Sequence, residues 1–91
     1  MAKLTEKQIT EGLQTIKGWK RAGDTITKTV KKKDFIHAMG FVQAVAFIAE
    51  KMNHHPDITI QWNTVRLTLT THSEGGLTAL DVECAKNINR I

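Results

Sequence analysis

Hydrophobic positions near both ends of the chain recur every three or four residues, which is the spacing of one face of an α-helix. The two stripes are Ile9, Leu13 and Ile16 near the start, and Leu80, Cys84, Ile88 and Ile91 near the end. A capping box precedes each stripe, because Thr5 is followed three residues later by Gln8, and Thr78 by Asp81. These patterns predict a first helix that begins after Thr5 and is ended by Gly18, and a last helix that begins after Thr78.

A third hydrophobic stripe, in the middle of the chain, is longer and wider. Its members are Phe35, Met39, Val42, Ala46, Ala49 and Met52, broadened by Phe41, Val45 and Ile48. Asp34 is a suitable N-cap, Asn53 can end the helix, and Pro56 cannot continue it. A stripe this wide implies burial against more than one surface, and one interpretation is a sheet on one side and a second subunit on the other. We therefore expect a homo-oligomer, either a dimer or a tetramer.

Between the predicted helices, short segments rich in alternating apolar and polar residues have the pattern of β-strands. The four predicted strands are residues 19–21, 25–31, 57–62 and 64–71. The strand at residues 25–31 is rich in Thr and Lys, which suits an exposed or edge position, whereas Trp62 is expected in the core. The order of elements predicts an α+β fold, in which three helices pack on one face of a four-stranded antiparallel sheet (α-β-β-α-β-β-α), as a single domain over residues 1–91.

Composition narrows the function classes. Lys and Arg number 13 against 9 Asp and Glu, a net charge of +4, but the aromatic residues do not interleave with the basic ones, so direct nucleic-acid binding is not expected. The apolar stretch at residues 41–49 is interrupted by Gln43 and is too short to span a membrane. Cys84 is the only cysteine; it is expected to be buried, and the absence of a disulfide framework indicates a cytoplasmic protein.

Three of the four histidines lie at the ends of predicted elements. His54 and His55 precede the third strand, and His72 follows the fourth. Antiparallel pairing places the start of one strand beside the end of the next, so we expect these three imidazoles at one end of the hairpin. Imidazole can give or take a proton near neutral pH, so the cluster predicts an acid–base site. His37, in the first turns of the long helix, is expected to be structural or surface-exposed.

A metal site and a covalent nucleophile are the alternatives. His54 and His55 are neighbours, and neighbouring side chains of an extended chain point to opposite sides, so chelation of one ion by both is awkward. Cys84 lies within a helical stripe, and Ser73 has no evident activating partner beyond His72. We therefore expect neither a bound metal nor a covalent nucleophile.

The histidines are part of a longer pattern with fixed spacings. It consists of Glu50, His54-His55-Pro56, then Trp62 after five residues, His72 after nine more and Asp81 after a further eight. This pattern resembles the signature of the pterin-4a-carbinolamine dehydratases, and the resemblance covers essentially the whole chain. Two positions depart from common members: Asn53 stands where Asp is often found, and Ile58 replaces a frequent aromatic residue, which bears on substrate preference.

The resemblance implies a lyase that eliminates water from a 4a-hydroxytetrahydropterin to give the quinonoid dihydropterin, without metal or cofactor, and so supports recycling of tetrahydrobiopterin. It implies that His54, His55 and His72 are the catalytic residues. The residues that match the pterin-contacting stretches are His54, His55, Pro56, Thr71, His72, Ser73 and Glu74. We expect His54 and His72 to divide the acid and base roles and His55 to bind and orient the pterin.

Two carboxylates are candidate supporting residues. Glu50 lies one turn before His54 and can bond a histidine or a pterin amine, or remain a solvated helix carboxylate. Asp81 has a strong structural alternative as the cap of the last helix. A second hypothesis for the whole protein is a binding module that stabilises a partner's oligomer, as animal relatives do; the intact set of three histidines favours the enzyme.

Overall fold

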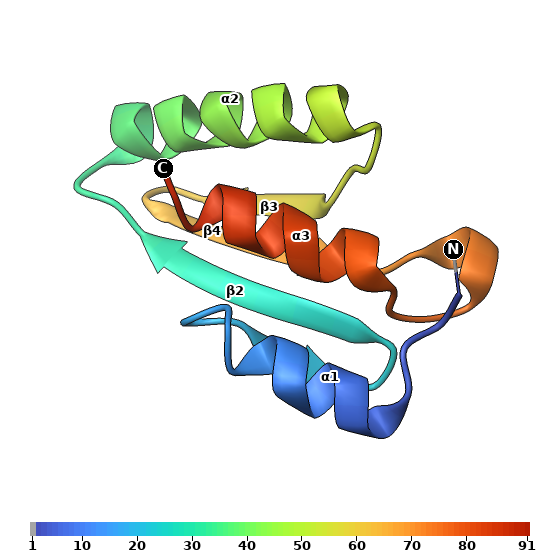
Figure 1. Cartoon of the computed structure of the whole chain (residues 1–91). Helices are drawn as coiled ribbons and strands as arrows, with labels where there is room; N and C mark the ends of the chain where they lie inside the picture. Colours follow the sequence, from blue (N-terminus) through green and yellow to red (C-terminus); the bar gives the residue numbers. More distant parts are fainter. Residues whose placement is uncertain (1) are drawn as a thin grey trace.

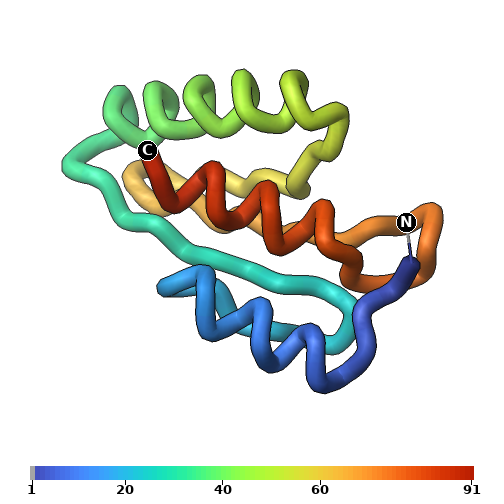
Figure 2. Tube along the Cα trace, viewed as in Figure 1, coloured from blue at the N-terminus to red at the C-terminus, as the bar shows by residue number. Residues whose placement is uncertain are grey.

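The computed structural model describes residues 2–91, and its elements follow the predicted order. They are α1 (Glu6–Leu13), β1 (Lys20–Ala22), β2 (Thr25–Lys31), α2 (Phe35–Met52), β3 (Asp57–Gln61), β4 (Thr64–Leu69), the short 3-10 helix η1 (His72–Glu74) and α3 (Ala79–Ile88). Figures 1 and 2 show the same path as a ribbon and as a tube, with the first described residues near the loop that joins β4 to α3. The predicted α+β class is confirmed.

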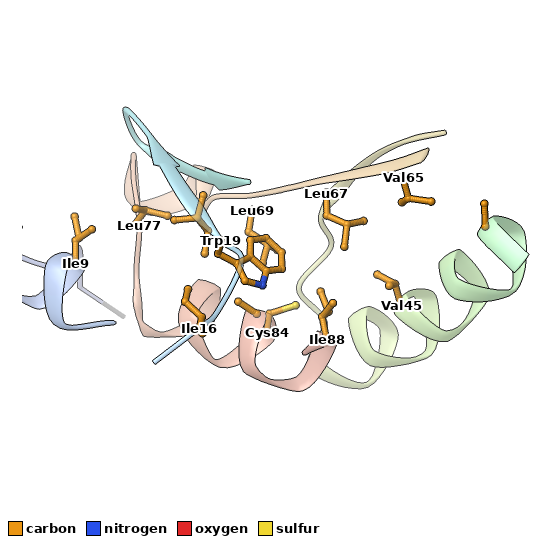
Figure 3. Close-up of a cluster of buried hydrophobic side chains, with 13 residues drawn as sticks. Ile9, Ile16, Trp19, Val45, Val65, Leu67, Leu69, Leu77, Cys84 and Ile88 are labelled. Carbon is orange, nitrogen blue, oxygen red and sulfur yellow. The ribbon is translucent and has the colours of Figure 1, made fainter. Parts of the chain in front are cut away.

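The four strands form one antiparallel sheet in the order β1-β2-β4-β3. Directly opposed residues of an antiparallel pair share a face, so the register Ile26↔Leu69 and Val30↔Val65 places the apolar residues of β2 and β4 together. Their side chains meet those of the helices, including Val45 of α2. In Figure 3 the strands lie on one side of this cluster and the helices on the other. All three helices therefore cover one face, as predicted.

Residues 25–31 were expected in an exposed or edge position, and the edge position is wrong, because β2 pairs with both β1 and β4. Its threonines instead lie on the face of the sheet that carries no helix, together with Thr59 and Arg66. That helix-free face contains a polar hollow of about 610 Å³ lined in part by Thr29, Thr59 and Arg66. The threonines of the strand indicated an open face of the sheet, which sequence periodicity does not distinguish from an edge.

Two other expectations are corrected. The first helix ends at Leu13, before Gly18, because Thr15 and Ile16 form turn-type bonds to the carbonyls of Gly12 and Leu13; Ile16 still lies in the core, and Gly18 adopts a positive φ of 88°. Trp62 is 67% exposed and not part of the core. It occupies the tight turn between β3 and β4, with a φ of 52°.

The ends of α2 are formed as predicted. The Asp34 carboxylate accepts a hydrogen bond from the His37 amide, and Asn53 adopts the left-handed conformation with a φ of 50°. α2 has 18 residues and is longer than the apolar stretch at residues 41–49. By length and composition alone, α2 is long and apolar enough to cross a membrane. Core helices of soluble proteins also meet this criterion. One side of α2 packs on β4 and α3.

Candidate active site

The start of β3 and the end of β4 lie at the same end of the sheet. Asp57, the first residue of β3, pairs with Thr68, next to the last residue of β4. Residues 54–56 therefore enter the sheet beside the point where residues 70–74 leave it. The pairing confirms the expected convergence of the segments that carry His54, His55 and His72.

His54 is turned into the protein by the end of α2. Asn53 breaks the helix in the left-handed conformation, and the His54 amide donates to the Ala49 carbonyl at 3.0 Å. The residue is only 9% exposed. Its Nε2 lies 2.6 Å from Oδ1 of Asp81, which is fully buried. A buried imidazole and a buried carboxylate thus form a hydrogen-bonded pair between the end of α2 and the first turn of α3.

The Asp81 carboxylate forms hydrogen bonds both at the start of α3 and with other segments of the chain. Its Oδ2 accepts from the Thr78 amide at 2.9 Å and from the Thr71 hydroxyl at 2.8 Å, while Oδ1 faces His54. The first contact completes the capping box of α3. Removing a carboxylate from water is costly unless it is hydrogen-bonded, and these contacts offset that cost. Asp81 therefore caps α3 and also contacts His54; its supporting role in the site stays a prediction.

His55 lies on the other side of the chain, as expected for a neighbour of His54. Its Nε2 contacts Oε2 of Glu50, one turn back on α2, and both side chains are exposed. The sequence offered Glu50 as a hydrogen-bond partner for a histidine, and the structure identifies that partner as His55. An exposed pair of this kind contributes at most about 1 kcal/mol to stability.

The remaining candidates are in or beside η1. His72, Ser73 and Glu74 form this single turn, and all three are exposed. Gly75 closes it in the left-handed conformation and donates to the His72 carbonyl. Thr71, directly before the turn, is buried.

Thr78 was missed as a member of this network. Its hydroxyl lies 2.9 Å from that of Thr71, and both residues are buried. The capping box correctly placed Thr78 at the start of α3, but this local motif cannot show that the same carboxylate also reaches Thr71 and His54. The signal that the sequence offered for this network was the fixed spacing between Asp81 and the histidines in the family pattern.

Pro56, the last of the substrate-contact candidates, is partly buried between α2 and β3. His37 lies at the opposite end of α2, where its Nδ1 is 2.6 Å from Oδ1 of Asp34, so it is separate from the other histidines. Within residues 2–91, no three His, Cys, Asp or Glu side chains are grouped closely enough to hold a metal ion.

Cys84 lies one helical turn after Asp81 and is fully buried, as expected. Burial, with a further contribution from the Asp81 charge, raises the pKa of its thiol to about 11. Because the thiolate is the reactive form, Cys84 is unsuited to act as a nucleophile at neutral pH.

The fold and the site define a small α+β protein with a buried, hydrogen-bonded histidine–aspartate pair at one end of its sheet. A family model described as "Pterin 4 alpha carbinolamine dehydratase" matches residues 2–91. The chain therefore belongs to the pterin-4a-carbinolamine dehydratase family, whose members are enzymes of the lyase class.

Individual relatives agree with this assignment. A Sulfurisphaera tokodaii protein is 50% identical over 91 residues, covering all of this chain and 98% of its own. A Nocardia farcinica protein is 46% identical over 88 residues, covering 97% and 93%. Both are named "Putative pterin-4-alpha-carbinolamine dehydratase". A crystal structure of a "transcriptional coactivator/pterin dehydratase" from Brucella melitensis superposes with a TM-score of 0.92 at 41% identity, covering 97% of this chain and 96% of that one.

Proposed function

We propose that this protein eliminates water from a 4a-hydroxytetrahydropterin to give the quinonoid dihydropterin, using His54, His55 and His72. The observation that carries the proposal is the buried 2.6 Å contact between His54 and Asp81, at the end of the sheet where residues 71–74 also lie. A carboxylate on one ring nitrogen orients an imidazole and stabilises its protonated form. His54 is thereby prepared to exchange a proton through its other nitrogen.

The elimination needs one acid and one base. The bond between ring carbon 4a and the hydroxyl breaks as an imidazolium protonates the departing oxygen, and the hydroxyl leaves as water. A base removes a proton from a ring nitrogen, whose electrons form the new double bond. His54 and His72 divide these two roles, and each positioned proton transfer contributes roughly 10²–10⁴-fold to the rate.

His55 binds and orients the pterin. It is exposed and paired with the exposed Glu50, so it is accessible to a ligand at the end of α2. The full set of proposed pterin contacts is His54, His55, Pro56, Thr71, His72, Ser73 and Glu74. We place the reaction in the cytoplasm, without metal or cofactor, in the recycling of tetrahydrobiopterin.

The exposed side of α2 supports a homo-oligomer. Phe35, Ile36, Met39 and Phe47 are 45–79% exposed on this one helix. Large apolar side chains gathered on one surface are typical of interfaces, and we propose that a second copy of the chain covers them. The same face favours a second function as a protein-binding module, in keeping with the Brucella melitensis protein described as a coactivator.

Titration of the 15N-labelled protein with 7,8-dihydrobiopterin, a stable analogue of the product, tests the site. We expect the amide resonances of residues 54–55 and 71–74 to shift, and those around Thr59 and Arg66 on the helix-free face to stay in place. Shifts confined to the helix-free face, or no binding at millimolar concentration, would overturn the proposal.

A further inference from the structure

Two buried threonines lie behind the histidine–aspartate pair. The Thr71 hydroxyl is 2.8 Å from Asp81 Oδ2 and 2.9 Å from the Thr78 hydroxyl, which in turn lies 3.2 Å from the Leu80 amide. Thr71 is 7% exposed and Thr78 is fully buried. Within residues 2–91 no buried side-chain nitrogen or oxygen lacks a partner, so the network is closed.

The direction of each hydrogen bond follows from counting protons. An ionised carboxylate only accepts, so the single proton of the Thr71 hydroxyl is donated to Asp81 Oδ2. The contact between the two hydroxyls then requires Thr78 to donate to Thr71. The Leu80 amide donates to the Thr78 oxygen and completes that hydroxyl. Each of the two hydroxyl protons therefore forms one hydrogen bond.

The same count assigns the proton on His54. Asp81 Oδ1 can only accept, so Nε2 of His54 carries a hydrogen and donates it across the 2.6 Å contact. In the neutral ring the other nitrogen, Nδ1, is then unprotonated. The orientation of the carboxylate, which Thr71 and Thr78 fix through Oδ2, thus decides which nitrogen of His54 is free.

We propose that Thr71 and Thr78 are positioning residues that hold the Asp81 carboxylate against Nε2 of His54, so that Nδ1 is the nitrogen that exchanges a proton with the substrate. This inference rests on the proposed function for its substrate, but the ring tautomer is a property of the free protein.

Thr71 also helps to fix the position of His72, because it directly precedes His72 in the chain. Its amide donates to the Gly76 carbonyl at 3.1 Å, and the Gly76 amide returns a bond at 3.3 Å, which closes the loop that contains η1. The Thr71 hydroxyl joins this loop to Asp81 and, through it, to His54. One side chain therefore links the segments that carry the two proposed acid–base residues.

Two substitutions of Thr71 separate the effect of its hydroxyl group from the effect of its side-chain shape. Thr71→Val keeps the shape of the side chain and removes the hydroxyl, so Asp81 Oδ2 loses one of its two donors. Thr71→Ser keeps the hydroxyl and loses only a methyl group. Thr68→Val is the matched control, because Thr68 lies near the same end of β4 but on the helix-free face. Thr78 is less suitable, because its side chain also caps α3.

Long-range 1H–15N correlation spectra of the histidine rings, recorded where His54 is neutral, report the tautomer directly. We expect Nε2–H for His54 in the wild type, Thr71→Ser and Thr68→Val, and a mixture of tautomers in Thr71→Val. Since a hydrogen bond to a charged group contributes about 1.4 kcal/mol or more, kcat for the carbinolamine should fall about tenfold in Thr71→Val and recover in Thr71→Ser.

Nδ1–H on wild-type His54 would overturn the inference, as would an unchanged kcat in Thr71→Val or an equal loss in Thr71→Ser. These measurements distinguish a failure of the hydrogen-bond network from a failure of the proposed function. A protein without dehydratase activity whose His54 still changes tautomer in Thr71→Val would refute the function and support the network.

Discussion

His54 and Asp81 are 27 positions apart in the chain, and their side chains meet at 2.6 Å inside the protein. The contact joins the residue that follows the C-cap of α2 to the first turn of α3. The two helices also pack against one another. The proposed catalytic imidazole is therefore held by the same residue that completes the capping box of the last helix.

Asp81→Asn tests this dependence. The amide removes the carboxylate charge beside His54 and cannot accept hydrogen bonds at both positions where the carboxylate does. We expect kcat to fall about 100-fold or more, and the free energy of unfolding to fall by about 1 kcal/mol through the weakened cap. Steady-state kinetics and urea denaturation measure the two effects.

Asp57→Asn is the matched control for this substitution, because Asp57 is exposed at the start of β3 near the same end of the sheet. Its kcat should remain within about twofold of the wild type, since an exposed carboxylate contributes little to its surroundings. A wild-type kcat in Asp81→Asn would refute the role of the buried pair.

Glu50→Gln should have a much smaller effect than Asp81→Asn. Glu50 and His55 are both exposed, and water screens their interaction. We expect KM for the pterin to rise by about twofold to fivefold, which corresponds to less than 1 kcal/mol, with kcat unchanged. A drop in kcat of more than tenfold would indicate that Glu50 takes part in the chemical step, and would contradict its assignment to substrate binding.

Phe47→Glu tests the proposed subunit interface on α2. Phe47 is 70% exposed, so a charge there is solvated in an isolated subunit but would be buried without a partner in an oligomer. We expect light scattering to show a larger species for the wild type and a lower mass for the variant, with an unchanged far-ultraviolet circular dichroism spectrum. Thr59→Glu on the helix-free face is the control and should keep the wild-type mass. A wild-type protein that is a monomer at micromolar concentration would contradict the interface.

Cys84 gives the stability a defined pH dependence. Burial raises the pKa of its thiol from about 9 to about 11 in the folded protein. Between these values the unfolded chain releases the thiol proton and the folded chain keeps it, so the contribution of Cys84 is complete below pH 9 and is lost as the pH rises towards 11. Urea denaturation at pH 8 and pH 10.5 should show a loss of about 2 kcal/mol that is absent in Cys84→Ala. An equal loss in both proteins would show that other groups are responsible.

Much of the fold followed from local chemistry in the sequence. The caps at Thr5, Asp34, Asn53 and Thr78 depend on contacts within a few residues, and all four were confirmed. The convergence of the histidine-bearing segments followed from the antiparallel pairing of two adjacent strands. Both kinds of inference use short-range rules that tertiary packing rarely overturns.

The errors arose where a pattern is compatible with two tertiary settings. Polar residues in β2 indicated an exposed side, which was the open face of the sheet and not its edge. Trp62 was expected in the core as part of an alternating strand pattern, but it lies in the tight turn with Asn63 and is exposed. The bond between Thr71 and Asp81 joins different elements ten positions apart, and no periodicity in the sequence reports such a contact.

The most direct test of the account is the rate at which a synthetic 4a-hydroxytetrahydropterin is dehydrated, followed by stopped-flow absorbance, with wild type, His54→Ala and His72→Ala. His37→Ala serves as the control, because His37 is bonded to Asp34 at the far end of α2. The account predicts that the wild type accelerates dehydration, that His54→Ala and His72→Ala each lose about 10²-fold or more in kcat, and that His37→Ala matches the wild type. A wild type no faster than the uncatalysed reaction, or near wild-type rates in both His54→Ala and His72→Ala, would contradict it.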